Sequence, residues 1–251
     1  MSQQKLVASI LDLGELLLMS GAEVNRIEDT IERIGEAYGF VRTDVFTITS
    51  SIVLTVQTKE GDIVTQTRRI KAVETNLAKV EEINRLSREI CETRPEVSYM
   101  ESEIAKIKEV PEYSEVIIGF AYAMIAAVFS IFFGGNIMDA VASAIGALVI
   151  RFVLRNGQRV QMNPIILSII CSGASGIVAM VLASIGVGQS IDKIIIGNIM
   201  LLIPGIAFTT ALRDMIKGDI ISGLLQLSEA LLRAIAVAIG FLIIWFGKGG
   251  L

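Results

Sequence analysis

The chain has 251 residues, of which 53% are apolar and 19% charged, and its formal net charge is −4. So little charge is untypical of a water-soluble protein, and the negative balance excludes a basic stripe for nucleic acid. The chain has no histidine, which excludes His-based triads and relays, and Cys91 and Cys171 fall in different parts of the chain and make no metal site. We therefore expect neither an enzyme nor a bound cofactor or metal.

Charge divides the chain into two parts. Residues 1–112 carry 14 Lys and Arg against 20 Asp and Glu, whereas residues 113–251 carry 8 against 6. The first part is charged like a domain in water, and the second suits the hydrocarbon of a lipid bilayer. We predict a soluble α+β domain over 1–112, followed by an all-α transmembrane domain over 113–251.

The first part contains both helical and strand patterns. Apolar residues at helical spacing predict helices, and a stretch rich in Val, Ile and Thr predicts strands. In chain order the predicted elements are helices over 6–19 and 22–38, two strands within 41–58, a strand over 63–70, and helices over 74–92 and 101–108. The strand-rich middle interrupts any heptad and so excludes a coiled coil.

Hydropathy rises abruptly from Val116. A bilayer core about 30 Å thick needs roughly 20 apolar residues in a helix. About five candidate spans satisfy this, at about 116–134, 137–154, 164–187, 194–212 and 230–247. The third of these carries no charge along its whole length.

Basic residues occur in alternate loops between the predicted spans. The second loop carries Arg151, Arg155 and Arg159, and the fourth carries Arg213 and Lys217, whereas the first loop has no basic residue. Cytoplasmic loops carry the excess of Lys and Arg. We therefore expect a multi-pass protein of the cell (inner or plasma) membrane, with a cytoplasmic N-terminal domain and the C-terminus outside.

The fourth predicted span is interrupted by Pro204 and Gly205. Proline removes a backbone donor, and in a membrane the freed carbonyl needs a partner. Either that partner is a ligand or a water-filled cavity, or the break is a simple packing kink. Polar residues that could contact a solute flank the break, namely Asn198, Thr209 and Thr210. Many transporters pair two odd-helix halves around a midplane site. We therefore expect a second membrane subunit, or self-association, to complete the pathway.

Charged residues supply the remaining candidates. Asp139 lies just inside the second span, where its carboxylate either binds a coupling proton or cation or caps the start of the helix. Arg213, Asp214, Lys217 and Asp219 cluster beyond the broken span. An arginine there either meets a substrate carboxylate or belongs to an ion-paired loop that also signals topology.

Four stretches of the chain resemble the threonine/serine exporter family. They are LLLMSGAEVNRIEDTIERIGEAYGF, TITSSIVLTV, FFGG followed by Asp139, and IPGIAFTTALRDMIKGDIISGLLQLSEALLRA. Together they look like the N-terminal half of the family, in its split, two-subunit form. The resemblance implies an inner-membrane exporter of bacteria or archaea that uses the proton motive force. It implies threonine and serine, or in the split form succinate, as solutes.

The resemblance also marks individual positions. The family motif carries Gly21, Asn25, Arg26 and Glu28 in the first part, and Gly134, Gly135, Asp139, Pro204, Gly205, Asp214, Gly218 and Asp219 in the second. Gln226 stands where an arginine often follows the glycine in this pattern.

The leading hypothesis is therefore a subunit of a secondary exporter for small carboxylate-bearing solutes, acting with a second membrane subunit. The alternative is a membrane-anchored sensor or regulator whose cytoplasmic domain binds a small ligand.

Overall fold

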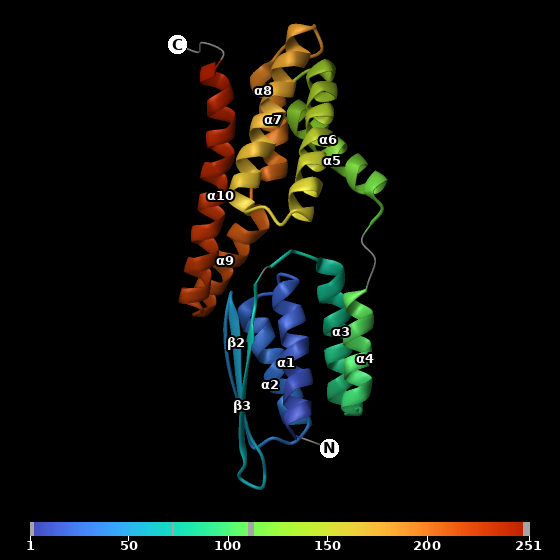
Figure 1. The fold of residues 1–251 in the computed structure, drawn as a ribbon, viewed down its shortest axis with the longest axis vertical. Helices are drawn as coiled ribbons and strands as arrows, with labels where there is room; N and C mark the ends of the chain where they lie inside the picture. The colour runs from blue at the N-terminus through green and yellow to red at the C-terminus, as the bar shows by residue number, and fades with distance from the viewer. Residues whose placement is uncertain (1–2, 72, 110–112, 248–251) are drawn as a thin grey trace. The chain divides into compact units, whose positions relative to one another are not determined.

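The structure, a computed structural model, describes residues 3–71, 73–109 and 113–247. The chain forms two compact units (Figure 1). The N-terminal unit comprises Met1–Pro111 together with Phe208–Leu227, and the helical unit comprises Glu112–Ala207 together with Ser228–Leu251. The boundary predicted between residues 112 and 113 adjoins residues 110–112, which lie outside the described residues.

The N-terminal unit combines helices with a small antiparallel sheet. The sheet has the order β1-β2-β3, and Leu54 of the central strand pairs with Val45 on one side and Gln66 on the other. Its helices and strands are α1 (Gln3–Met19), α2 (Val24–Ala37), β1 (Arg42–Ile48), β2 (Ser51–Gln57), β3 (Ile63–Arg69), α3 (Leu77–Thr93) and α4 (Val97–Lys108). The predicted mixture of helices and strands in this part of the chain is therefore present.

Helix α1 is the centre of this unit. It contacts α2, α3, α4 and two of the strands, and residues on all its sides are buried. The central strand alternates, with Ile52, Leu54 and Val56 turned into the core. Asp12, on the polar side of α1, pairs with Arg68 of β3 at 2.8 Å. Burial of the large aliphatic side chains of α1 and the central strand stabilises the unit.

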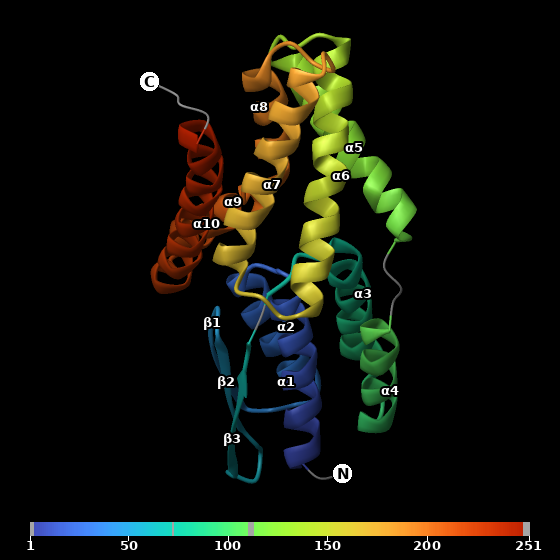
Figure 2. The same ribbon diagram turned by 45° about the horizontal axis from the view of Figure 1, so that its top comes forward.

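The four helix starts differ from the prediction by two to four residues, and those of α3 and α4 (Figure 2) have a clear physical reason. Helix α3 begins at Leu77 rather than at 74, because the side chain of Asn76 accepts the Lys79 N–H at 3.0 Å and so caps the helix. Helix α4 begins at Val97 rather than at 101. Val97 and Met100 are both buried, so the apolar face of α4 starts one turn earlier than its charged sequence suggested.

The membrane-capable helices lie in the helical unit and in the segment Phe208–Leu227 of the N-terminal unit. They are α5 (Glu115–Phe132), α6 (Ile137–Arg159), α7 (Pro164–Ser184), α8 (Ile191–Leu202), α9 (Gly205–Lys217) and α10 (Ile220–Gly247). Among the described residues, four helices are long and apolar enough to cross a membrane, or five if α8 and α9 form one span bent by 50°. This is a mostly helical, multi-pass membrane architecture.

The last two predicted spans differ from the observed helices. The segment 194–212 is not one helix, because α8 ends at Leu202 and α9 starts at Gly205. The segment 230–247 is the later part of α10, which already begins at Ile220. Gln226 and Glu229 lower the local hydropathy, but neither residue interrupts a helix. Gly218, with φ at +106°, separates α9 from α10.

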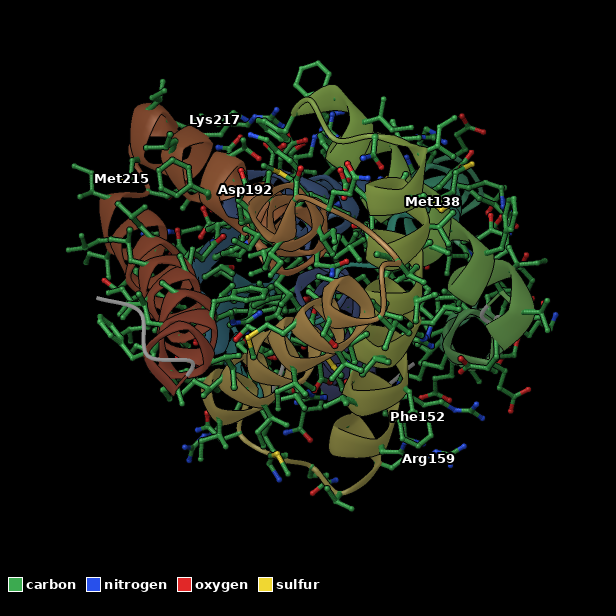
Figure 3. All side chains as sticks on the ribbon, turned by 90° about the horizontal axis from the view of Figure 1, so that it is seen from above. Met138, Phe152, Arg159, Asp192, Met215 and Lys217 are labelled. Atoms are coloured by element: carbon green, nitrogen blue, oxygen red, sulfur yellow. The ribbon has the colours of Figure 1, made fainter. Side chains whose placement is uncertain are left out.

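Packing in the helical unit places small residues inside and large apolar residues outside. Ala126, Ala142 and Ser143 are fully buried, whereas Met138 and Phe152 are 55% and 68% exposed. Figure 3 shows the side chains of Met138 and Phe152 pointing away from the helices. Exposed apolar side chains over small buried residues are typical of helices that pack in lipid.

Candidate functional site

An acid cluster lies where α2 meets the α9–α10 segment within the N-terminal unit. Glu23, directly before α2, forms ion pairs with Arg213 and with Lys217, the latter at 2.9 Å. The side chain of Glu23 is 13% exposed. Burial acts to raise the pKa of Glu23, but hydrogen bonds from Lys217 and Arg213 outweigh it, so the pKa lies below its ordinary value. Arg213 therefore takes part in an ion-paired junction within this unit.

Glu28 is the second acid of the cluster and lies one turn further along α2. Its side chain is half-buried and accepts the backbone N–H of Thr47 at 2.7 Å. Burial raises the pKa of Glu28, and the nearby carboxylates of Asp219 and Glu32 raise it further, while the Thr47 hydrogen bond acts the other way. The net direction is upward, so Glu28 retains a proton more readily than an exposed glutamate does.

Asp214 on α9 is the most deeply buried acid of the cluster, with no exposed surface. Its Oδ2 accepts the side-chain amide of Gln226 at 2.9 Å. Its Oδ1 is buried and has no hydrogen-bond partner among the described residues. A buried carboxylate oxygen without a donor is costly, so this oxygen is suited to hold a proton or to accept from a ligand.

Gln226 contacts Asp214 without adding a charge. The amide donates one hydrogen bond but carries no charge, whereas an arginine at this position would supply a cation. The same segment of α10 is tied to the sheet by Ser222, whose hydroxyl donates to the Thr47 carbonyl at 3.4 Å. Thr47 thus contacts both Glu28 and the α10 segment.

The cluster brings together two parts of the predicted set that lie far apart in sequence. Glu28 comes from the first motif, and Asp214 and Asp219 come from the last. Within the described residues no three His, Cys, Asp or Glu side chains are arranged to hold a metal ion. The arrangement supports proton binding and release at a buried carboxylate better than metal coordination.

A second polar cluster lies in the helical unit between α6, α7 and α8. Ser143 on α6 donates to the Ala126 carbonyl at 3.1 Å and lies 3.2 Å from Oδ1 of Asn198. Asn198 is fully buried, and its Nδ2 has no hydrogen-bond partner among the described residues. Gly146 makes room for this amide, since a Cβ at that position would overlap Nδ2. Asn198 therefore lies in a packed polar interior rather than at the helix break.

Asp139 is engaged as a helix cap. Its Oδ2 accepts the Asn136 N–H at 2.9 Å, while the Asn136 side chain accepts the Asp139 N–H at 2.9 Å, which is a capping box. Its Oδ1 accepts the N–H groups of Gln189 and Ser190 at 2.6 and 2.9 Å. Both oxygens thus hold backbone donors, and this geometry supports the capping interpretation.

The remaining predicted residues occupy other positions. Pro204 lies between α8 and α9, Gly205 is the first residue of α9, and Ile203 retains a hydrogen bond to the Ile199 carbonyl at 3.0 Å. Thr209 is exposed and Thr210 is half-buried, both on α9. In the N-terminal unit Gly21 has φ at +82°, where a Cβ would lie 3.2 Å from Thr75, and Asn25 and Arg26 are exposed. The predicted residues therefore do not converge on one site.

Sequence reasoning missed Glu23 and Thr47 in the acid cluster and Ser143 beside Asn198. One signal was present for Ser143, because Asn136, Asp139 and Ser143 recur three and four positions apart and so share one helix face. No local signal marked Glu23 or Thr47, whose partners lie 190 and 19 residues away in the chain.

The fold and these clusters define a multi-pass membrane protein whose bent helix pair, α8 and α9, is apolar enough to cross a membrane, and whose acid cluster includes Asp214 of α9. A family model described as "Putative threonine/serine exporter" matches residues 8–246. The chain belongs to this threonine/serine exporter family.

Two relatives illustrate the range of the family. The chain is 23% identical over 242 residues to a "Probable threonine/serine exporter" of Mycobacterium tuberculosis, covering 96% of this chain but 46% of that protein. It is 24% identical over 243 residues to a "Probable succinate transporter subunit YjjP" of Klebsiella aerogenes, covering 95% of this chain and 93% of that protein. The chain thus spans about half the length of the first relative and nearly all of the second. No solved structure matches the chain.

Proposed function

We propose that the chain is one subunit of a secondary exporter that moves small amino acids such as threonine and serine, or small dicarboxylates such as succinate, out of the cell. The names of the two relatives support these solute classes. The observation that carries the proposal is the membrane-capable pair of helices α8 and α9, which is bent by 50° at Pro204 and Gly205. The second helix of the pair carries the buried Asp214. Broken helices of this kind line the solute pathways of many secondary transporters.

The proposal includes a second membrane subunit. The membrane-capable helices number four or five among the described residues, which is few to enclose a solute pathway. The relative of similar length is named a transporter subunit, whereas the other relative is about twice as long as the matched region. The alternative arrangement is self-association, in which a second copy of this chain supplies the further helices.

The proposal also assigns an orientation and domain roles. Residues 1–112 form a cytoplasmic domain, residues 113–251 form the transmembrane domain, and the C-terminus lies outside. The alternation of basic loops supports this topology, because Arg155 and Arg159 follow one span and Arg213 and Lys217 follow another. Reporter fusions at the C-terminus test it directly, and activity of a cytoplasm-specific reporter there would reverse the orientation.

Asp214 and Glu28 are the residues that we assign to proton exchange. The free oxygen of Asp214 and the raised pKa of Glu28 make both groups suited to change protonation as the solute moves. The Pro204–Gly205 break supplies the flexible point of the pathway, and Thr209 and Thr210 supply polar contacts near it. Arg213 is held by Glu23, so it contacts a solute carboxylate only if that ion pair opens.

The test is export from intact cells. Cells that carry the chain together with its second subunit should release threonine, serine or succinate faster than cells that lack the chain, and an imposed proton gradient should change that rate. Co-purification in detergent identifies the second subunit, or a copy of this chain, for the comparison. Equal release without this chain overturns the proposal.

Two substitutions sharpen the test. Asp214→Asn keeps the size of the side chain but cannot exchange a proton, so we expect export to lose its response to the proton gradient. Asp192→Asn is the matched control, because Asp192 is 61% exposed and pairs only with Lys193 among the described residues. Replacement of Pro204 and Gly205 by leucine should abolish export while the chain remains inserted.

The rival function is a membrane-anchored sensor whose N-terminal unit binds a small ligand. One observation favours it, namely a charged groove between α2 and α3. A sensor predicts that another membrane anchor can replace the helical unit with function retained. Loss of function with any substituted anchor would therefore favour the exporter.

A further inference from the structure

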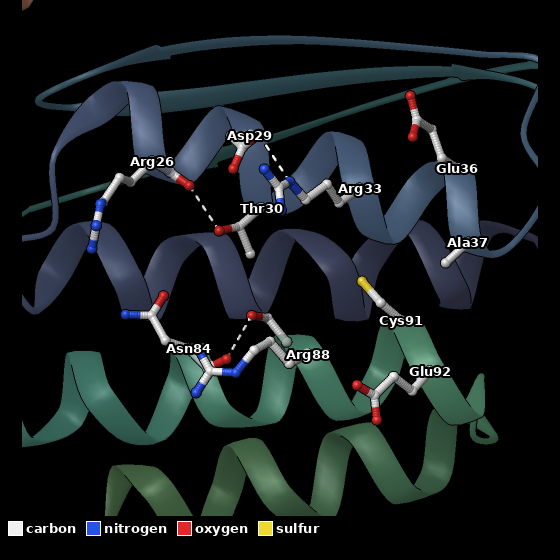
Figure 4. A pocket seen from close by; sticks show the side chains of 11 residues that line it. Arg26, Asp29, Thr30, Arg33, Glu36, Ala37, Asn84, Arg88, Cys91 and Glu92 are labelled. Carbon is white, nitrogen blue, oxygen red and sulfur yellow. Dashed lines mark hydrogen bonds and ion pairs between the residues drawn. The ribbon is translucent and has the colours of Figure 1, made fainter.

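A polar groove of about 730 Å³ lies between α2 and α3 of the N-terminal unit (Figure 4). Arg26, Thr30 and Arg33 line it from α2, and Asn84 and Arg88 line it from α3. On each helix the lining residues recur three or four positions apart, so one face of each helix forms a wall. None of these residues except Arg26 belongs to the predicted site, and none belongs to the acid cluster.

Opposite charges occupy opposite ends of this groove. In Figure 4 the basic end holds Arg26, Asn84 and Arg88, and the other end holds Glu36 and Glu92. The two helices run in the same direction in this view, so the charge order along both walls is the same. A solute with a carboxylate at one end and an ammonium at the other matches this order.

The charges at the two ends are available to a ligand. Arg33, in the middle of the groove, pairs with Asp29 at 2.9 Å. By contrast, Arg26 and Arg88 at one end have no ion-pair partner within the residues that the structure describes, and the same holds for the two glutamates at the other end. A simple anion would be repelled by the glutamates, and a simple cation by the arginines.

We propose that this groove binds a small zwitterionic amino acid, with its carboxylate at Arg88 and its ammonium group toward Glu92. Arg26 and Glu36 are ten residues apart on α2, about 15 Å, and extend the same charge order beyond the ligand. Guanidinium groups bind carboxylates through two parallel hydrogen bonds. The four residues from Arg88 to Glu92 rise about 6 Å along the helix, which an α-amino acid spans together with its hydrogen bonds. Thr30 and Asn84 add uncharged polar contacts. The site is independent of the acid cluster and is present whether the chain exports the solute or senses it.

Cys91 provides a direct readout, because it lines the groove and is partly buried, whereas Cys171 is buried in α7. The assay is alkylation of Cys91 by a maleimide in the purified full-length chain in detergent, with Cys91→Ser as the blank. Burial raises the pKa of the Cys91 thiol, so the reaction is run at mildly alkaline pH, where more thiolate is present. No transport is needed, so failure of this assay is distinct from failure of export.

Threonine or serine should slow the alkylation of Cys91 by about tenfold at ten times its dissociation constant, by mass action. Propionate, which lacks the ammonium group, and ethanolamine, which lacks the carboxylate, should leave the rate unchanged at the same concentration. If neither amino acid protects Cys91, or if propionate protects it as well as threonine does, the proposal is overturned.

Arg88→Gln tests the carboxylate contact. Loss of one charge-assisted contact should raise the half-protecting threonine concentration by about tenfold. Arg85→Gln is the matched control, because Arg85 lies on the same helix but outside the groove and pairs with Glu82 and Glu89. Threonine should protect Cys91 in Arg85→Gln at the same concentration as in the unmodified chain. If threonine protects Cys91 equally well in Arg88→Gln, the proposed placement of the carboxylate is excluded.

Discussion

The two units of this protein bury different kinds of side chain. In the N-terminal unit most fully buried residues are large and aliphatic, such as Ile31 and Leu54, whereas in the helical unit most are small, such as Ala142 and Ser143, with Ile150 as an exception. Water drives large apolar groups into a core, but lipid chains solvate them as well as a core does. The difference agrees with the predicted division into a part surrounded by water and a part surrounded by lipid, which stays a prediction.

The units also treat buried polar groups differently. The helical unit satisfies Asp139 with backbone donors and buries neutral groups such as Asn198. The N-terminal unit holds two acids with little exposure, the half-buried Glu28, whose pKa is raised by burial, and the fully buried Asp214. Titratable groups with little exposure near a membrane-capable helix are the ones that can couple protonation to movement of a solute. Stability measurements can therefore test the comparison one unit at a time.

The largest effect is expected from a cavity in the N-terminal core. Ile31→Ala should lower the free energy of unfolding of that unit by about 2–5 kcal/mol, because the surrounding side chains cannot fully close the space. Ile31 has no exposed surface. The control is Phe152→Ala, a larger truncation at a side chain that is 68% exposed, which should have almost no effect. Urea titration in detergent, followed by circular dichroism, measures both variants, and equal losses would break the comparison.

Overpacking should be the sensitive change in the helical unit. Gly197→Ala adds a Cβ that would lie 2.5 Å from the Ala126 carbonyl oxygen and overlap the Ser143 hydroxyl. We expect a loss of about 1–3 kcal/mol, measured as a lower midpoint of thermal unfolding in detergent. Gly119→Ala is the matched control, since its Cβ would meet only Leu148 at 3.6 Å. A harmless Gly197→Ala would show that α8 packs less closely than described.

The cap of α6 should contribute less. Asn136→Ala removes the side-chain acceptor of the capping box with Asp139 and should cost about 1 kcal/mol. Thermal unfolding in detergent measures the change. Asn156→Ala is the control, because among the described residues the Asn156 side chain donates only to the carbonyl one turn before it on the same helix. If Asn136→Ala matches the control, the capping role of this loop is wrong.

The smallest effects concern two glutamates of the N-terminal unit with opposite pH dependence. The lowered pKa of Glu23 means that its contribution is present above its ordinary value of 4.5 and is lost as pH falls through the lowered pKa. Glu23→Gln should therefore destabilise the unit at neutral pH, by less than about 1 kcal/mol because its partners are largely exposed. This difference should disappear in acid.

The raised pKa of Glu28 gives its contribution to stability the opposite pH dependence. Its charge is unfavourable at neutral pH, and that cost is relieved as pH falls through the raised pKa toward 4.5. Glu28→Gln should therefore be the more stable protein at neutral pH and equal to the unmodified chain in acid. Unfolding midpoints across this pH range measure both variants, and the same sign for both would contradict the assigned environments.

Sequence patterns predicted much of the fold but little of the site. The strands around Leu54 and the first three membrane-capable helices follow from local periodicity and hydropathy. The start of α10 was missed, because Gln226 and Glu229 depress hydropathy without ending a helix. The acidic candidates were named by type, but their partners were not, since hydropathy and spacing carry no information about which distant residues meet.

The sequence by itself determined that this protein has membrane-capable helices and a charged region with a small sheet, because both properties depend on residues that are neighbours in the chain. Only the tertiary structure decided that Asp139 is held by the loop at Gln189 and Ser190 and that Glu28 lies near Asp219. Burial and hydrogen bonding depend on which elements pack together. That packing is set by contacts between residues tens to hundreds of positions apart.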